Sequence, residues 1–536
     1  MNLNNLIFII IGSVSSVLAQ DIGITEVKVI ENFKPVITEV KRLNENANFA
    51  DTIKRDRSQT YEMMDVSLIS DYKLEKLLAA KVKNDRIIKL YTTKVGIGFG
   101  SSYNALSSFV HNSNRSENLS YSIIANHASN KYDVAKTSKN TLNLYAKRIY
   151  SDFILFANLD YDRRVALYHD KNFNYNMEKF YINRFAYTKF SFSAMSKIKD
   201  KNKLQHNTIF FISDLNEFSE NQVHLSSNFS KKLYGLPFKG KIEINEYVRY
   251  KSAPNIINSD FQIFSTQAAT SLSYYGINFD FSLDFNFINY SYLNFFPQIN
   301  VTKELVNDIL FVYGGLRYSK IKHTLKSLSD DNPYIHSFGT NQSILNDSIL
   351  LNELRLSNTQ ELYLGIKNFL DNDELFEASI AYGFVDNLEF FDVVDHPNYN
   401  RFLIRYLDLY QLHISSNYQR PINQIISLRA NIDYYSWEKK IFNKPNLTIN
   451  LSSPINLRNK IKISPSISYV SKMNNNDYFI TELPARLHLD LSSYYFYSRQ
   501  LSAYLILNNL TNSKKDILMG YREIGFNLVL GLNFSF

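Results

Sequence analysis

The sequence predicts an all-β protein, a transmembrane antiparallel up-and-down β-barrel of about 18–22 strands, preceded by a short N-terminal periplasmic segment. Three observations lead to this prediction. The chain begins with an apolar stretch typical of an export signal, apolar and polar residues alternate through most of the remaining length, and the last residue is a phenylalanine at the end of an alternating segment. Together they indicate an exported protein that crosses a membrane with strands rather than helices.

The N-terminus has the pattern of a cleavable export signal. The apolar stretch Leu6–Leu18, which includes small residues, is too short for a membrane-spanning helix but fits the apolar core of a signal peptide. Small residues at the recognition positions place the cleavage between Ala19 and Gln20, so residues 1–19 are expected to be removed. Because residues 2–5 carry no Lys or Arg, an uncleaved apolar N-terminal helix is the alternative. A cleaved signal on a barrel directs it to the cell outer membrane.

From about Lys89 onward the dominant period is two residues. In Ile277–Phe287 every odd position is apolar and every even one is polar, and the C-terminal run Ile524–Phe536 alternates in the same way with mostly polar or small residues. Successive side chains of a strand point to opposite faces, so each segment has one apolar and one polar face. The polar faces of these two segments supply the candidates to line the lumen, namely Asn278, Asp280, Asp284, Asn527 and Asn533.

The apolar faces are expected to meet lipid rather than a protein core. The strand pattern continues over residues 89–536 without a Pro/Gly-rich linker, whereas a soluble all-β domain seldom exceeds ~250 residues. The opposite faces carry Asn, Asp, Ser and Gly in mid-strand, which suits a wet lumen. If a strand and its connection take ~20–25 residues, this region forms a barrel of about 18–22 strands.

The last strand ends on two aromatic side chains, Phe534 and Phe536. A terminal aromatic residue on an amphipathic last strand resembles the recognition signal that outer-membrane proteins present to the barrel-assembly machinery. The barrel-assembly machinery and outer-membrane lipid are therefore expected partners.

The composition favours the same class of protein. The 536 residues include 38 Tyr and 39 Phe, which favour strands and suit the boundary between lipid and water. The absence of cysteine excludes a disulfide framework, a thiolate zinc site, a cysteine nucleophile and a lipid anchor on cysteine. The net charge of +8 comes from Lys and Arg scattered along the chain rather than gathered on one face, so no nucleic-acid partner is expected.

The C-terminal residues resemble the end of TonB-dependent receptor barrels. In that family an aliphatic-x-Asn-Leu-x-Asn strand leads through a Gly-Tyr-x-x-x-Gly turn into the final strand, and Leu505–Asn512, Gly520–Tyr521 and Gly525 follow this pattern. The glycines would serve the turn, and the asparagines would satisfy backbone groups where the strand ends. The whole layout, with Lys34–Pro35 before the first strand, resembles the shortened, plug-less TonB-dependent-receptor-like barrels of Bacteroidota.

Residues 20–88 depart from the pattern of full receptors, which carry a much longer plug domain before the barrel. The segment lacks the glycine-rich pattern of a plug, and Asp71–Val82 has the apolar spacing of a short amphipathic helix. Ile24–Val29 has the extended character of a TonB box, which pairs with its partner as an added strand, although a plain periplasmic tail is the preferred interpretation. We expect residues 20–88 to lie in the periplasm or to fold back and occlude the lumen.

No pattern in the sequence indicates catalysis. HExxH, P-loop and GxSxG patterns are absent and the ten histidines are dispersed, so we expect no enzyme activity, no cofactor and no metal. The acidic clusters Asp330–Asp331 and Asp371–Glu374 could bind calcium, but solvated loop tips are the preferred interpretation.

Two functions are compatible with a barrel whose sequence contains no catalytic pattern. The first is to pass or receive solutes across the outer membrane, as the resemblance to TonB-dependent receptors implies. The alternative is a non-transport structural or assembly component that binds periplasmic or outer-membrane protein partners. The small and polar residues on the inward faces of the two strands described above favour an open, hydrated lumen, and hence the first function.

Overall fold

The computed structural model describes residues 90–536, except for 115–117, 133–134, 168–181, 198–199, 201, 217–218, 250–260, 290–291, 336–353, 371–373, 395–400 and 476–481. The predicted signal peptide with its cleavage between Ala19 and Gln20, the segment 20–88 and its helix lie outside the described residues. Within the described part, Leu90–Phe536 belongs to one compact unit.

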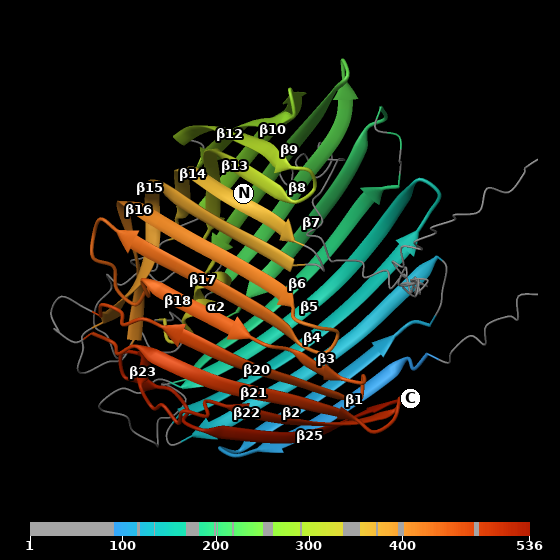
Figure 1. The fold of residues 1–536 in the computed structure, drawn as a ribbon, viewed down its shortest axis with the longest axis vertical. Coiled ribbons are helices and arrows are strands. Elements are labelled where there is room, and N and C mark those ends of the chain that lie inside the picture. Colours follow the sequence, from blue (N-terminus) through green and yellow to red (C-terminus); the bar gives the residue numbers. More distant parts are fainter. Residues whose placement is uncertain are drawn as a thin grey trace, which may run out of the picture. The chain divides into compact units, whose positions relative to one another are not determined.

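The strands form one closed antiparallel sheet in which each strand pairs with its neighbours in sequence (Figure 1). The first strand pairs with both the second and the last, which closes the ring. Two short consecutive strands, β18 and β19, both pair with β20, so the 23 strands of the sheet occupy 22 positions around the barrel, as the sequence predicts. The strands are β1 (Thr93–Gly100), β2 (Asn104–Asn112), β3 (Leu119–Tyr132), β4 (Ala135–Ile149), β5 (Phe153–Leu167), β6 (Ile182–Ser196), β7 (Gln205–Leu215), β8 (Glu220–Leu233), β9 (Leu236–Arg249), β10 (Phe261–Tyr274), β11 (Ile277–Ile288), β12 (Tyr292–Val306), β13 (Leu310–Lys322), β14 (Leu356–Leu370), β15 (Glu374–Val394), β16 (Arg401–Pro421), β17 (Ser427–Trp437), β18 (Leu447–Ser452), β19 (Ile455–Leu457), β20 (Ile461–Val470), β21 (Arg486–Phe496), β22 (Leu501–Asn508) and β25 (Asn527–Ser535).

The two faces of the sheet differ as the two-residue period predicts. Large apolar side chains are exposed on the outer face, for example Leu362 at 66% and Leu530 at 56%, while polar side chains such as Glu243 and Asn286 are buried. In a water-soluble protein such a surface would be turned inward, but in a closed ring it meets lipid. The chain is therefore a transmembrane β-barrel.

Glycines let aromatic rings lie across neighbouring strands at three places. Phe229 is in register with Gly240, Tyr313 with Gly365, and Tyr504 with Gly531. A Cβ atom added at any of these glycines would come within 2.4 Å of the facing ring. The missing side chain is therefore what allows the ring to reach over the strand, and the ring in turn covers the exposed backbone.

The two ends of the barrel carry different connections. At the end where Thr93 donates to the carbonyl of Phe536, two-residue turns join β8 to β9 and β10 to β11. Both residues of each turn, Tyr234–Gly235 and Tyr275–Gly276, have positive φ, as the tightest hairpin turns require. We call this the turn end. The opposite end, which we call the loop end, carries the longer connections between β13 and β14 and between β22 and β25.

The helix that the structure describes lies at the loop end. Helix α2 (Leu325–Asp331) follows β13, and its first turn is closed by a capping box in which Thr324 and Ser327 exchange side-chain and backbone hydrogen bonds. Among the described residues, no helix is long and apolar enough to cross a membrane. A second small element there is a hairpin of β23 (Asp516–Leu518) and β24 (Tyr521–Arg522), in the connection between β22 and β25.

Candidate functional site

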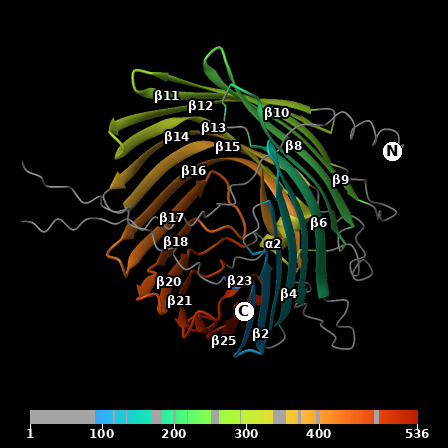
Figure 2. The same ribbon diagram turned by 90° about the vertical axis from the view of Figure 1, so that its right-hand side faces the viewer.

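Residues 323–335, which include α2, fold into the barrel mouth at the loop end, and we call them the cap (Figure 2). The side chains of Leu325, Leu328 and Ile335 are completely buried. They belong to one apolar cluster with Phe185 on β6 and Phe402 on β16. These two strands lie ten positions apart in the ring of 22, so the cap joins nearly opposite walls.

Polar side chains of β5 and β6 hold one side of the cap. Lys326 lies 2.8 Å from the carboxylate of Asp162, and Arg164 donates to the carbonyl of Asp330 at 2.8 Å. Asn183 donates to the carbonyls of Pro333 and Ile335, each at 2.9 Å. These donors satisfy carbonyl groups at and beyond the helix C-terminus.

The other side of the cap contacts β14, β15 and the connection between β22 and β25. His323 Nε2 lies 2.6 Å from Ser357 Oγ and 3.2 Å from a carboxylate oxygen of Glu389. The ring of Tyr334 stacks on that of Tyr521 with centroids 3.5 Å apart and an interplanar angle of 16°. Burial raises the pKa of Tyr334. The cap is thus fixed by contacts from several directions at once.

The connection that supplies Tyr521 is built as the C-terminal pattern predicts. Gly520 has a φ of +79° in the turn between β23 and β24. Asn509 donates to the carbonyls of Ser513 and Ile524 at 2.7 and 2.9 Å, and Asn512 accepts from the amide of Phe526. The predicted roles of Gly520 and of the two asparagines are therefore confirmed.

Asp330 and Asp331 were expected at a solvated loop tip; both are exposed, as expected, but they are helical, so the loop part of that prediction is wrong. They form the last turn of α2 inside the barrel mouth, and burial raises the pKa of Asp331. The local pattern Asp-Asp-Asn-Pro resembles a turn because the helix does end there. Thr324, Ser327 and the apolar spacing of Leu325 and Leu328 were the available signals of a helix. The second acidic cluster, Asp371–Glu374, lies mostly outside the described residues.

A cavity of about 760 Å³ lies between the cap and the neighbouring wall. Arg164 and Tyr334 line it beside the cap, and Arg486 and Asn527 line it from β21 and β25. It is therefore an internal space of mixed polarity below the loop end.

Paired charges also lie on the inner wall formed by β9 and β13. Glu243 is 3% exposed and accepts from Lys241 at 2.8 Å and from Asn245 at 2.9 Å, and it also pairs with Lys322 of β13. A buried carboxylate is tolerated only with such partners. The charge of Glu243 is thus satisfied by neighbours on the same inner wall.

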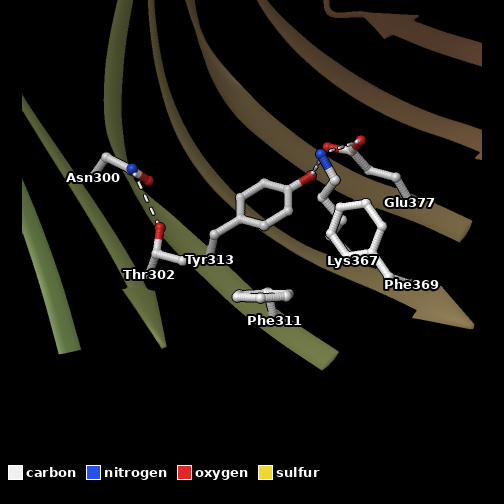
Figure 3. Close-up of a pocket in the computed structure, with 7 residues that line it drawn as sticks. All are labelled: Asn300, Thr302, Phe311, Tyr313, Lys367, Phe369 and Glu377. Atoms are coloured by element: carbon white, nitrogen blue, oxygen red, sulfur yellow. Dashed lines mark hydrogen bonds and ion pairs between the residues drawn. The ribbon is translucent and has the colours of Figure 1, made fainter. Parts of the chain in front are cut away.

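A smaller pocket of about 310 Å³ lies near the turn end, and we call it the turn-end pocket (Figure 3). The hydroxyl of Tyr313 donates to Glu377 at 2.9 Å, and Lys367 Nζ lies 3.8 Å from the other oxygen of the same carboxylate. Two Phe rings flank these groups with centroids 5.9 Å apart. The lining residues are Asn300, Thr302, Phe311, Tyr313, Lys367, Phe369 and Glu377.

Three of the five residues predicted to line the lumen lie along β11 and two along the distant β25, and each bonds to a polar side chain of a nearby strand or turn. They do not form a single site. Asp284, which is 5% exposed, accepts from Gln267 and Gln298, Asp280 accepts from Asn300, Asn278 accepts from Ser273, Asn527 accepts from Ser101 and Asn104, and Asn533 donates to Ser502.

Phe534 and Phe536 are about half exposed, and their rings stack with centroids 5.9 Å apart. Across the part of the chain that the structure describes, no group of three or more His, Asp or Glu side chains could hold a metal ion.

Comparison with known proteins supports the fold. Neither a protein-family model nor a curated protein matches the sequence. Solved receptor structures do match the fold. The ferric enterobactin receptor of Pseudomonas aeruginosa is 14% identical with a TM-score of 0.61, over 83% of this chain and 81% of the receptor. The siderophore receptor PirA of the same organism is 12% identical with a TM-score of 0.57, over 83% and 79%.

The ferric-catecholate import receptor Fiu of Escherichia coli K12 is 11% identical with a TM-score of 0.57, over 83% of this chain and 82% of the receptor. At these identities the likeness is one of fold. The chain therefore has the TonB-dependent-receptor-like barrel fold that its C-terminal residues suggest.

Proposed function

We propose that the protein passes or receives solutes across the outer membrane through a lumen that the cap closes at the outer face. The observation that carries this proposal is the cap itself, a buried segment that joins nearly opposite walls of a barrel with polar inner side chains. In transmembrane barrels the short turns lie on the periplasmic side and the longer loops outside. The loop end and its cap accordingly face the exterior.

The inner side chains support a hydrated passage below the cap. Asp280, Asp284 and Asn533 bond to polar neighbours rather than to an apolar core, as expected of a wall that contacts water. With Asn278 and Asn527, they are our candidates for lining residues. The similar solved structures are named as receptors or an import receptor, which agrees with a role in solute uptake.

The remaining features of export belong to the same proposal. Residues 1–19 direct the chain to the outer membrane and are removed between Ala19 and Gln20, and Phe534 and Phe536 present the chain to the barrel-assembly machinery. Residues 20–88 form a short periplasmic or occluding segment in place of a plug, as in the plug-less TonB-dependent-receptor-like barrels of Bacteroidota. Neither a catalytic role nor a cofactor is part of this function.

Single-channel conductance in a planar bilayer tests the passage. We compare the refolded full-length protein with a variant that carries Asn183→Ala and Lys326→Ala, because these changes remove polar anchors of the cap and spare its apolar core. The variant should open more often or conduct more current than the parent protein. An equal, steady conductance in both proteins would show that the cap does not close the passage.

The alternative is a structural or assembly component whose lumen stays closed. The crowded apolar cluster at the loop end favours it, because bulky buried side chains obstruct a channel. If both proteins fold and insert but never conduct, this alternative becomes the better description, and the search turns to protein partners.

A further inference from the structure

The turn-end pocket contains two opposite charges that are close but not hydrogen-bonded. Lys367 Nζ and Glu377 Oε2 are 3.8 Å apart, which is longer than a hydrogen bond between these groups. Their side chains are 36% and 35% exposed, so water reaches both. An ion pair of this kind contributes little to stability, and its partners are available to a ligand.

The neighbouring strand holds Glu377 in position. Tyr313 lies on β13 and Glu377 on β15, with β14 between them, and the Tyr313 ring crosses β14 at Gly365. Its hydroxyl donates to Glu377 Oε1 at 2.9 Å. One carboxylate oxygen is therefore occupied, and the other is directed toward Lys367 and the pocket (Figure 3).

Apolar rings form the rest of the wall near the charges. Phe311 and Phe369 meet edge to face at 88°, and the ammonium group of Lys367 lies 5.0 Å from the centre of the Phe369 ring. The contact with this ring helps to position the ammonium group. The pocket volume of about 310 Å³ lies at the lower end of the range for small-molecule sites.

We propose that the turn-end pocket binds a dipolar solute of the amino-acid type. Its ammonium group contacts Glu377, its carboxylate contacts Lys367, and an apolar side chain lies against Phe311 and Phe369. Such a ligand replaces one loose ion pair by two charge-assisted hydrogen bonds. A simple anion or cation would satisfy one charge of the pocket and leave the other without its partner. The inference names a solute class for the passage proposed above and rests on that proposal, but the binding can be measured without transport.

Equilibrium dialysis against the full-length protein in detergent tests the binding with three probes. L-phenylalanine carries both charges, N-acetyl-L-phenylalanine lacks the ammonium group, and L-phenylalaninamide lacks the carboxylate. L-phenylalanine should bind saturably, and each derivative should bind about five- to tenfold more weakly, because one charge-assisted contact is lost in a partly solvated pocket.

Two variants assign each charge to its partner. Glu377→Gln should weaken the binding of L-phenylalanine by the same factor and leave the binding of N-acetyl-L-phenylalanine unchanged. Lys367→Gln should weaken the binding of L-phenylalanine and leave the binding of L-phenylalaninamide unchanged. The matched controls are Glu482→Gln and Lys472→Gln, from an exposed ion pair elsewhere in the chain, and they should not alter binding.

The inference is wrong if the folded parent protein shows no saturable binding, or if the three probes bind it equally well. It is also wrong if Glu377→Gln weakens all three probes equally. The comparison of probes on the parent protein needs no variant to fold. Conductance measured on the same preparation separates this failure from failure of the proposed passage, because a barrel can conduct without binding L-phenylalanine.

Discussion

The two ends of this barrel use the same strands in opposite ways. At the loop end, completely buried side chains such as Leu328 and Phe402 join distant walls, and Asn183 satisfies carbonyl groups of the cap. At the turn end, two-residue turns join β8 to β9 and β10 to β11, and Lys367 and Glu377 remain about one-third exposed among the residues that the structure describes. Burial with satisfied polar groups holds a segment in place, whereas exposed and loosely paired charges are available to a solute.

The strongest way to break this contrast is to open a space under the cap. Leu328→Ala removes completely buried methyl groups and should destabilise the closed cap by about 2–5 kcal/mol relative to the open one. Hydrogen exchange of residues 325–335 should become much faster, while exchange in the strands is unchanged. The exposed Leu457→Ala is the control. Equal exchange in the two variants would mean that apolar packing does not hold the cap.

A polar change at the same end should have a smaller effect. Asn183→Ala removes the two hydrogen bonds that Asn183 donates to the carbonyls of Pro333 and Ile335, and it should cost about 1–3 kcal/mol of cap stability. Limited proteolysis of the folded protein near residues 333–335 would detect the loss. Asn278→Ala is a matched control, because that side chain bonds only at the far end of β11. Unchanged resistance to proteolysis would argue against a role for Asn183 as an anchor.

These effects concern the part of the molecule that the sequence did not reveal. The strands and their two unlike faces follow from a two-residue period, which is local and visible in Ile277–Phe287. The chain length gives the strand number only as a range of about 18–22, and the structure has 22 positions at its upper end. The roles of Asn509 and Asn512 are also local, because their hydrogen bonds close one connection. Such features can be predicted from short segments.

The cap and the turn-end pocket depend on residues that are distant in sequence. The cap looks like a solvated turn because its burial comes from Phe402 and Tyr521, on elements that follow much later. The pocket depends on Tyr313 facing Gly365, and this register is set by strand pairing over the whole hairpin. Neither contact can be read from the local pattern of apolar and polar residues.

At the turn end, a side chain at Gly365 should test whether the Tyr313 ring is needed for binding in the turn-end pocket. Gly365→Ala places a Cβ within 2.4 Å of the Tyr313 ring, which must move away from Glu377. Binding of L-phenylalanine should weaken severalfold, and overpacking should cost about 1 kcal/mol of stability. Gly240→Ala creates the same conflict with Phe229, away from the pocket, so it should cost similar stability without affecting binding. Equal loss of binding in both variants would contradict a specific role for Tyr313.

The smallest effect is expected from the acidic end of α2. Because burial raises the pKa of Asp331, the cap is favoured at low pH and loses this contribution as the pH rises through the pKa of the folded protein. Asp331→Asn should stabilise the cap at neutral pH by only a few tenths of a kcal/mol, because the Asp331 carboxylate is only partly desolvated and keeps its contact with solvent. Asp330→Asn, which weakens the contact with Lys326, should have the opposite sign. Hydrogen exchange at pH 4 and pH 7 compares the two variants.

The central claim is that the cap faces the exterior and closes the lumen. The chain has no cysteine, so single cysteines report accessibility without background. Asn417→Cys lies in register with Glu377 beyond the cap, and Tyr103→Cys lies in an exposed turn at the loop end. Both are treated in intact cells with a bulky, membrane-impermeant maleimide.

We predict that Tyr103→Cys is labelled rapidly in every background. Asn417→Cys should be labelled slowly when the cap is intact and rapidly when Leu328→Ala and Asn183→Ala are added. Rapid labelling of Asn417→Cys beneath an intact cap, or no increase after the cap is released, would contradict the account.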